Sequence, residues 1–110
     1  MILGEVIGSV VSSRKDDSLV GLKLLIVQEL TVGCAPTGSI VVAADAVGAG
    51  VHEIVLCASG SSARLTEVTK DRPVDTVIMA IVDSFDVDGE WRYRKENGLP
   101  RDAPAPARRG

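Results

Sequence analysis

The sequence predicts an all-β domain: a small β-barrel with one short helix and a C-terminal β-hairpin extension. Three observations support this class. Short runs rich in Val, Ile and Leu recur at close spacing, each bounded by glycine, proline or polar turn residues. No segment indicates a long helix. Glycines interrupt the apolar runs, as they do where strands bend at the corners of a small barrel.

The N-terminal half supplies three of the predicted strands. Residues 2–13 are rich in β-branched side chains, and a polar, turn-rich break follows at 14–18. The apolar run at 22–30 is compatible by periodicity with a short buried helix, but its length and its neighbours favour a strand. A loop at 33–38 that contains glycine and proline then leads into the strand predicted at 39–47.

The rest of the predicted barrel has two strands, at residues 53–59 and 74–83. Between them the chain becomes polar, and Ser61 or Ser62 is placed to cap a single helical turn. Pro73 prevents a helix from continuing into the last strand. Strands at this spacing, without a long helix between them, complete the predicted barrel.

A hairpin extension is predicted after the barrel. An Asp-Gly pair at 88–89, a good two-residue hairpin signal, separates two short strands. Strict alternation predicts an aromatic face with Trp91 and Tyr93 and a basic face with Arg92 and Arg94. The polar, proline-bearing end is expected to be flexible. The predicted units are a barrel domain at 1–83, a hairpin extension at 84–94 and a flexible tail at 95–110.

Composition excludes several classes of protein. One domain is expected from 110 residues, and a net charge of −3 offers no basic footprint for nucleic acid. No apolar stretch approaches the roughly 20 residues that span a bilayer, and no secretory signal is visible, so we expect a soluble intracellular protein without a membrane partner. Cys34 and Cys57 fit no metal or redox spacing and are interpreted as buried reduced thiols. We predict no metal ion.

The stretch from Asp45 to Leu56 carries Gly-Ala-Gly at 48–50. The third glycine of a dinucleotide-binding fingerprint would fall at position 53, which is glutamate. That fingerprint also needs a helix after the loop, because the helix N-terminus supplies donors to the phosphates. A strand is predicted here instead, so phosphate binding by this loop is not favoured.

Catalytic chemistry is not indicated either. Cys57 lies in the middle of a predicted strand, whereas a catalytic thiol needs an electropositive, partly exposed site. His52 is the only histidine, and no G-x-S-x-G motif is present. Asp45, Asp75 and Asp83 sit at predicted strand ends, where solvated caps or ion pairs are expected. We assign no catalytic residue, and an enzyme that uses Cys57 and His52 ranks last among the hypotheses.

Binding of single-stranded nucleic acid by an OB-fold-type barrel is the alternative function. Such barrels use aromatic stacking platforms and a basic groove. The predicted barrel contains no Phe, Trp or Tyr, and only residues 91–95 interleave aromatic with cationic side chains. A solvated or interface hairpin is favoured over a nucleic-acid site because the net charge is negative.

Glycine and alanine runs let backbones approach closely, as a tight subunit interface or a crowded symmetry axis requires. Three stretches also occur in a familiar order: LGEVIGSVVSSRKDDSLVGLKLLIVQ at 3–28, ADAVGAGVHEIVLCASGSSAR at 44–64 and RPVDTVIMAIVD at 72–83. In this order and spacing they closely resemble the EutN/CcmL proteins. These are the pentameric vertex proteins of bacterial microcompartment shells, including carboxysomes.

The resemblance implies a fold, a function and partners. The fold would be a small barrel related to the OB fold, with a short helical piece at or after GSSAR. Five copies would form a homopentamer that caps the fivefold vertices of a shell in the bacterial cytoplasm, beside hexameric and trimeric shell proteins. The family has no enzymatic activity and no cofactor, so its role would be structural. A narrow opening along the fivefold axis would be a passage for small molecules.

The resemblance also implies candidate interface residues. The glycine-rich motif and the SGSSAR motif are expected at subunit contacts or near the fivefold axis. The KLL and PVD motifs at 23–25 and 73–75 match the family too, with fold maintenance or an interface role as alternatives. The candidate interface or axis residues are Gly48, Ala49, Gly50, His52, Glu53, Ser59, Gly60, Ser61, Ser62, Ala63 and Arg64.

Position 52 departs from the family pattern, which commonly has glycine where this chain has histidine. Five imidazoles around an axis would form a ring that titrates near neutrality or holds an anion or a metal. The favoured alternative is a histidine that points into solvent or caps a carboxylate.

Overall fold

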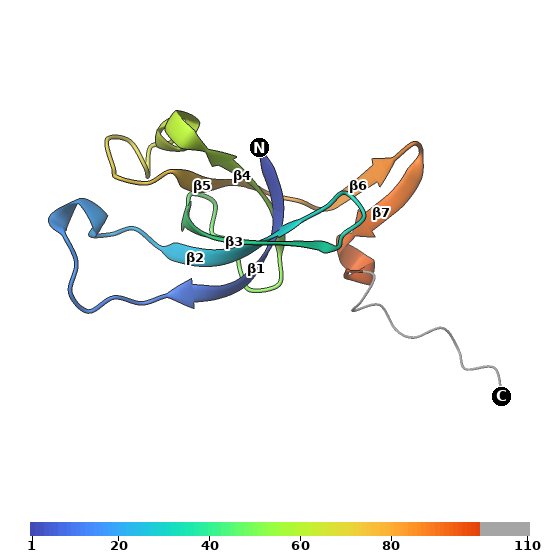
Figure 1. Cartoon of the computed structure of the whole chain (residues 1–110), viewed down its shortest axis with the longest axis horizontal. Helices are drawn as coiled ribbons and strands as arrows, with labels where there is room; N and C mark the ends of the chain where they lie inside the picture. The colour runs from blue at the N-terminus through green and yellow to red at the C-terminus, as the bar shows by residue number, and fades with distance from the viewer. Residues whose placement is uncertain (100–110) are drawn as a thin grey trace.

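A computed structural model describes residues 1–99 of the chain (Figure 1). Seven strands and three short 3-10 helices make up the described part. In chain order they are β1 (Ile2–Val10), η1 (Asp17–Leu19), β2 (Leu24–Leu30), β3 (Pro36–Asp45), β4 (Ile54–Ser59), η2 (Gly60–Arg64), β5 (Thr76–Ile81), β6 (Ser84–Val87), β7 (Glu90–Arg94) and η3 (Lys95–Asn97).

The first five strands form a closed barrel in the order β1-β2-β3-β5-β4, and β1 closes it by pairing with β4. All pairs are antiparallel except β3 with β5, which run parallel. The prediction of an all-β fold with a small barrel and a C-terminal hairpin is confirmed. Within the run at 22–30 the structure has a strand, Leu24–Leu30, as favoured. The next strand is Pro36–Asp45 and not the predicted 39–47, and proline is tolerated as its first residue.

Aliphatic side chains fill the barrel interior. Val6, Val27, Val55, Cys57 and Ile78 are fully buried there. Because strand side chains alternate between the two faces of a sheet, the residues between them point outward.

The two glycines of β1 have different roles. A Cβ atom at Gly4 would meet Val27 Cγ1 and lie 3.0 Å from the carbonyl oxygen of Gln28, so the backbone approach there requires glycine. At Gly8 the nearest atom to an added Cβ is Ile26 Cδ1 at 3.7 Å, an ordinary contact. Of the two glycines, only Gly4 therefore sits where the backbones approach too closely for a side chain.

The short helix η2 covers one outer part of the barrel wall. Its Ala63 is fully buried against Ala44, Ala58 and Val77 of β3, β4 and β5. Ser59 is the N-cap residue of this helix and makes no side-chain capping bond. The prediction that Ser61 or Ser62 caps the turn is therefore wrong, because the helix begins two residues earlier than a cap at Ser61 would allow.

The hairpin β6–β7 packs against the other end of the barrel (Figure 1). Its turn has positive φ at both central residues, 54° at Asp88 and 80° at Gly89, as the Asp-Gly signal predicts. The buried side chains that join hairpin and barrel are Leu30, Cys34, Ile54, Tyr93 and Leu99.

The predicted aromatic face of the hairpin is wrong. Tyr93 pairs with Phe85 and Trp91 pairs with Asp86, so one extra residue, Arg92, is inserted in β7 as a bulge. The bulge reverses the alternation, and Tyr93 is 5% exposed while Trp91 is 56% exposed. Tyr93 stacks on Phe85 with ring centroids 5.9 Å apart.

The first residues of the segment expected to be a flexible tail are packed. Residues 95–97 form η3, and Leu99 is 2% exposed. The remainder of the predicted tail, 100–110, lies outside the described residues. Within residues 1–99, no helix has the length and apolar character needed to cross a membrane.

Candidate functional site

The glycine-rich loop between β3 and β4 is held at its start by one carboxylate. Asp45 Oδ1 accepts hydrogen bonds from the backbone N–H groups of Val47, at 3.1 Å, and Gly48, at 3.0 Å. Its Oδ2 accepts from the N–H of Ala49 at 3.0 Å and lies 3.9 Å from Lys23 Nζ. Asp45 is buried, and its carboxylate already accepts the backbone N–H groups that would otherwise bind a phosphate.

A second carboxylate holds the end of the loop. Glu53 Oε1 accepts from the Gly50 N–H at 2.6 Å, and Oε2 accepts from Lys95 Nζ at 2.7 Å. The bond to Lys95, followed by the Gly50 bond, lowers the pKa of Glu53, and the same pairing raises the pKa of Lys95. Lys95 also donates its backbone N–H to Asp83 O at 2.8 Å. The loop is therefore fastened to the base of the hairpin.

His52 occupies a left-handed backbone position, with φ of 72°. Its N–H donates to Val6 O at 2.7 Å, and its Nδ1 lies 3.2 Å from Glu5 Oε2. The histidine side chain is 74% exposed and the Glu5 side chain is fully buried beneath it. The structure thus matches the favoured alternative, a histidine that caps a carboxylate. The positive φ also gives a physical reason for glycine at this position.

The two motifs predicted to form an interface lie at opposite ends of β4. The loop at 48–53 precedes this strand and residues 59–64 follow it. A six-residue strand is about 20 Å long, so within one chain the motifs do not form a single cluster. Ala49 and Ala63 are buried in their own chain, whereas Gly48, His52, Ser61, Ser62 and Arg64 are exposed.

An open depression of about 470 Å³ lies beside η2, lined by Ser18, Arg64, Asp71, Arg72 and Pro73. Arg72 Nη1 donates to Ser18 O at 3.0 Å and to Val20 O at 2.7 Å. This residue ties the loop that carries η1 to the loop before β5. Sequence reasoning missed this role, because nothing local in the chain shows which carbonyl groups an arginine will reach.

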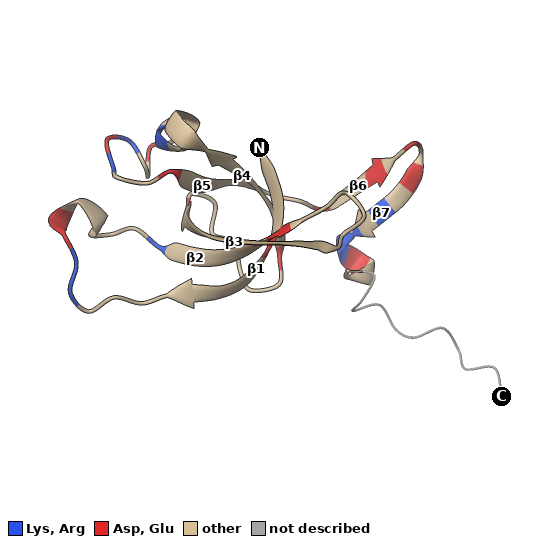
Figure 2. Cartoon of the chain, viewed as in Figure 1, with Lys and Arg blue, Asp and Glu red and all other residues tan. Residues whose placement is uncertain are grey.

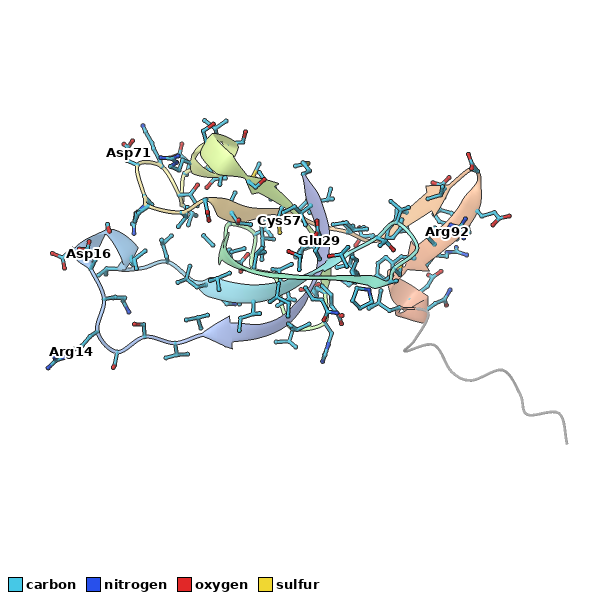
Figure 3. All side chains as sticks on the ribbon, viewed as in Figure 1. Arg14, Asp16, Glu29, Cys57, Asp71 and Arg92 are labelled. Atoms are coloured by element: carbon cyan, nitrogen blue, oxygen red, sulfur yellow. The ribbon has the colours of Figure 1, made fainter. Side chains whose placement is uncertain are left out.

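No nucleophile is activated in the described structure. Cys57 lies inside the barrel, and burial raises the pKa of its thiol to about 11 (Figure 3). Cys34 Sγ donates to Arg92 O at 3.3 Å. Among residues 1–99, no group of three or more His, Cys, Asp and Glu side chains is placed to hold a metal ion.

The hairpin does not form the stacking platform that a nucleic-acid module needs. Tyr93 is buried, and the Arg94 guanidinium covers the ring of Trp91 at 4.8 Å. Arg94 Nε also lies 3.3 Å from Glu96 Oε1. In Figure 2 the ribbon of the hairpin carries both acidic (red) and basic (blue) positions and no continuous basic stripe.

This chain is similar in sequence and in fold to known proteins. The family model described as "Ethanolamine utilisation protein EutN/carboxysome" matches residues 1–83. The carboxysome shell vertex protein CcmL of Gloeobacter violaceus is 43% identical over 97 residues, which cover 88% of this chain and 97% of that protein. Since 97 residues exceed the length of the family match, this likeness continues past Asp83 into the hairpin.

Solved structures are similar as well. That of Gloeobacter violaceus CcmL has a TM-score of 0.83 at 44% identity and covers 87% of this chain and 99% of its own. That of GrpN, a pentameric microcompartment shell protein from Rhodospirillum rubrum, has a TM-score of 0.70 at 46% identity and covers 79% of this chain and 98% of its own.

Proposed function

The chain belongs to the EutN/CcmL family of bacterial microcompartment shell vertex proteins, and from this membership we propose that it assembles as a homopentamer that closes the fivefold vertices of a shell. It is a structural protein and not an enzyme. The observation that carries the proposal is the match of the whole barrel to a family whose relative GrpN, at 46% identity, is pentameric.

Closure of a shell is a geometric task that this chain suits. A flat layer of sixfold units cannot enclose a volume, and fivefold units supply the missing curvature. A rigid subunit is required, because the angle between neighbouring subunits sets the shape of the vertex. The closed barrel and the loop fastened by Asp45 and Glu53 meet that requirement.

The partners follow from this role. We propose that the pentamer contacts hexameric and trimeric shell proteins along its rim. We propose that the glycine-rich loop and residues 59–64 lie at subunit contacts or near the fivefold axis. The side chains of Ala49 and Ala63 are buried within their own chain. These two residues would therefore contribute to a contact through their backbone, or by setting the shape of the loop and of the helix that carry them.

Native mass spectrometry tests the assembly. The expected species contains five copies of the 11.5-kDa chain. A monodisperse monomer or dimer at high protein concentration would contradict the proposal. Electron microscopy after co-expression with a hexameric shell protein tests the role: closed polyhedra are expected with this chain, and open sheets or tubes without it.

A further inference from the structure

The outer surface of β2 and β3 carries an apolar patch, which we call the β2–β3 face. Ile40 is 59% exposed, Val42 is 50% exposed and Val10, on the neighbouring β1, is 38% exposed. Ile26 is half-buried between them. The β2–β3 face consists of Val10, Ile26, Ile40 and Val42.

The strand register places these side chains together. Val42 pairs with Ile26, and Ile26 pairs with Gly8, so the three lie in one row across β3, β2 and β1. The alternate residues Val27 and Ala43 are fully buried inside the barrel, which confirms that Ile26 and Val42 point outward. Glycine in this row removes a side chain and flattens the surface.

Several other outer parts of the barrel wall are covered by the chain itself, although Ile7 and Met79 are 36% and 39% exposed. The helix η2 covers Ala58 and Val77, and the loop before β4 covers Glu5. The hairpin covers Ile54. Within residues 1–99, no other aliphatic part of the barrel wall is as exposed as the β2–β3 face, where two side chains are at least half exposed.

The face is also free of charge. No Asp, Glu, Lys or Arg occurs from Leu24 to Gln28 or from Pro36 to Ala44. In Figure 2 the ribbons of β2 and β3 are tan along most of their length. A contiguous apolar and uncharged patch on a soluble domain is typical of a protein contact.

A cyclic pentamer needs two different patches on each subunit, because the contacts in such a ring are head-to-tail. The glycine-rich loop supplies the second patch. Val47 and Val51 are 40% and 53% exposed on either side of Gly48, where an added Cβ would find no atom within 4 Å. Within one copy the loop contacts β1, where the His52 N–H donates to Val6 O, and no hydrogen bond in the described part of the chain ties Val47 or Val51 to the β2–β3 face.

We infer that the β2–β3 face of one copy receives the glycine-rich loop of the next copy around the ring, with Val47 and Val51 packed against Ile40 and Val42. This inference rests on the proposed pentamer. The occupant of the face is therefore a second copy of this chain. The absence of charge on the face favours an apolar contact such as the one with Val47 and Val51.

Glutamate substitutions test the contact. Val42→Glu and Ile40→Glu add a charge to the face, and Val51→Glu adds one to the loop, at positions that solvent already reaches in one chain. Each is expected to give a folded monomer by native mass spectrometry and circular dichroism. Val32→Glu is the matched control on the β2–β3 turn, where Val32 is 62% exposed, and it is expected to stay pentameric.

A mixing experiment tests the pairing of the two patches. Val42→Glu retains an intact loop, and isotope-labelled Val51→Glu retains an intact face, so together they can form one contact and no closed ring. The expected product is a 1:1 heterodimer. If the wild-type chain is pentameric and the Val42→Glu, Ile40→Glu or Val51→Glu variants remain pentameric, the inference is wrong and the proposed function stands. If the wild-type chain is monomeric, both fail.

Discussion

Replacing His52 by glycine and by alanine should separate two effects that the structure combines at one residue. His52 has a left-handed backbone, and its ring contacts the buried carboxylate of Glu5. Both substitutions remove the ring contact. Only glycine also removes the steric cost of the backbone conformation, so the difference between the two variants reports the backbone alone.

The expected magnitudes follow from the geometry. A left-handed conformation costs a residue with a Cβ atom roughly 1–2 kcal/mol. Glycine recovers this cost but loses about 0.4–1 kcal/mol through its greater freedom in the unfolded chain. The His52→Gly variant should therefore be more stable than His52→Ala by about 0.8 kcal/mol, the difference between the middles of the two ranges. Loss of the contact to Glu5 should cost both variants about 1 kcal/mol, below the roughly 1.5–3 kcal/mol typical of a bond to a charged group, because His52 is largely exposed.

Urea unfolding at one fixed protein concentration measures these differences, since the stability of an oligomer depends on concentration. Ser13 provides the matched control, because it is an exposed loop residue with an ordinary negative φ. There the order should reverse, with Ser13→Gly less stable than Ser13→Ala. Equal stability of the two His52 variants, or a less stable glycine variant, would refute the backbone argument.

Three further predictions concern the interior and the fastened loop. Gly4→Ala should lower the free energy of unfolding by about 1–3 kcal/mol through overpacking, whereas Gly8→Ala should be nearly neutral; equal effects in urea unfolding would contradict the barrel geometry. Because the pKa of Glu53 is lowered in the folded chain, its contribution to stability is complete above its ordinary value of 4.5 and is lost as the pH falls below it. Lys95→Met should therefore lower the melting temperature at pH 7 and reduce the further loss on acidification; an unchanged acid-side profile would count against the pairing. Iodoacetamide at about pH 8 should leave Cys57 unmodified until the chain is unfolded, as mass spectrometry can show, because burial raises its pKa to about 11; modification of Cys57 in the native protein would overturn that assignment.

The strands could be predicted from the sequence because their signals are local. Alternating aliphatic runs, turn residues between them and the Asp-Gly pair depend on neighbours in the chain, and each reappears in the structure. The order of the strands in the barrel is not local. The sequence did not predict this order, because no single strand indicates that β1 will pair with β4.

The candidate site was less predictable for a similar reason. The bulge at Arg92 reverses the alternation after one inserted residue, and no residue type marks it. The left-handed backbone at His52 could not be predicted, because residues other than glycine rarely adopt this conformation. The roles of Glu5 and Lys95 depend on contacts across more than 40 positions of the chain, which spacing in the sequence does not reveal.

Closure of the barrel also has a consequence for biosynthesis. The strand β1 cannot pair with its second neighbour until β4 has been synthesised, because Ile2 pairs with Cys57. The strand β5 (Thr76–Ile81) must then insert between β3 and β4. Pairing over such separations is slow compared with local structure formation. A nascent chain therefore cannot complete the barrel until β5, which ends at Ile81, has been synthesised. We therefore expect subunits to associate only after the fifth strand of the barrel is in place.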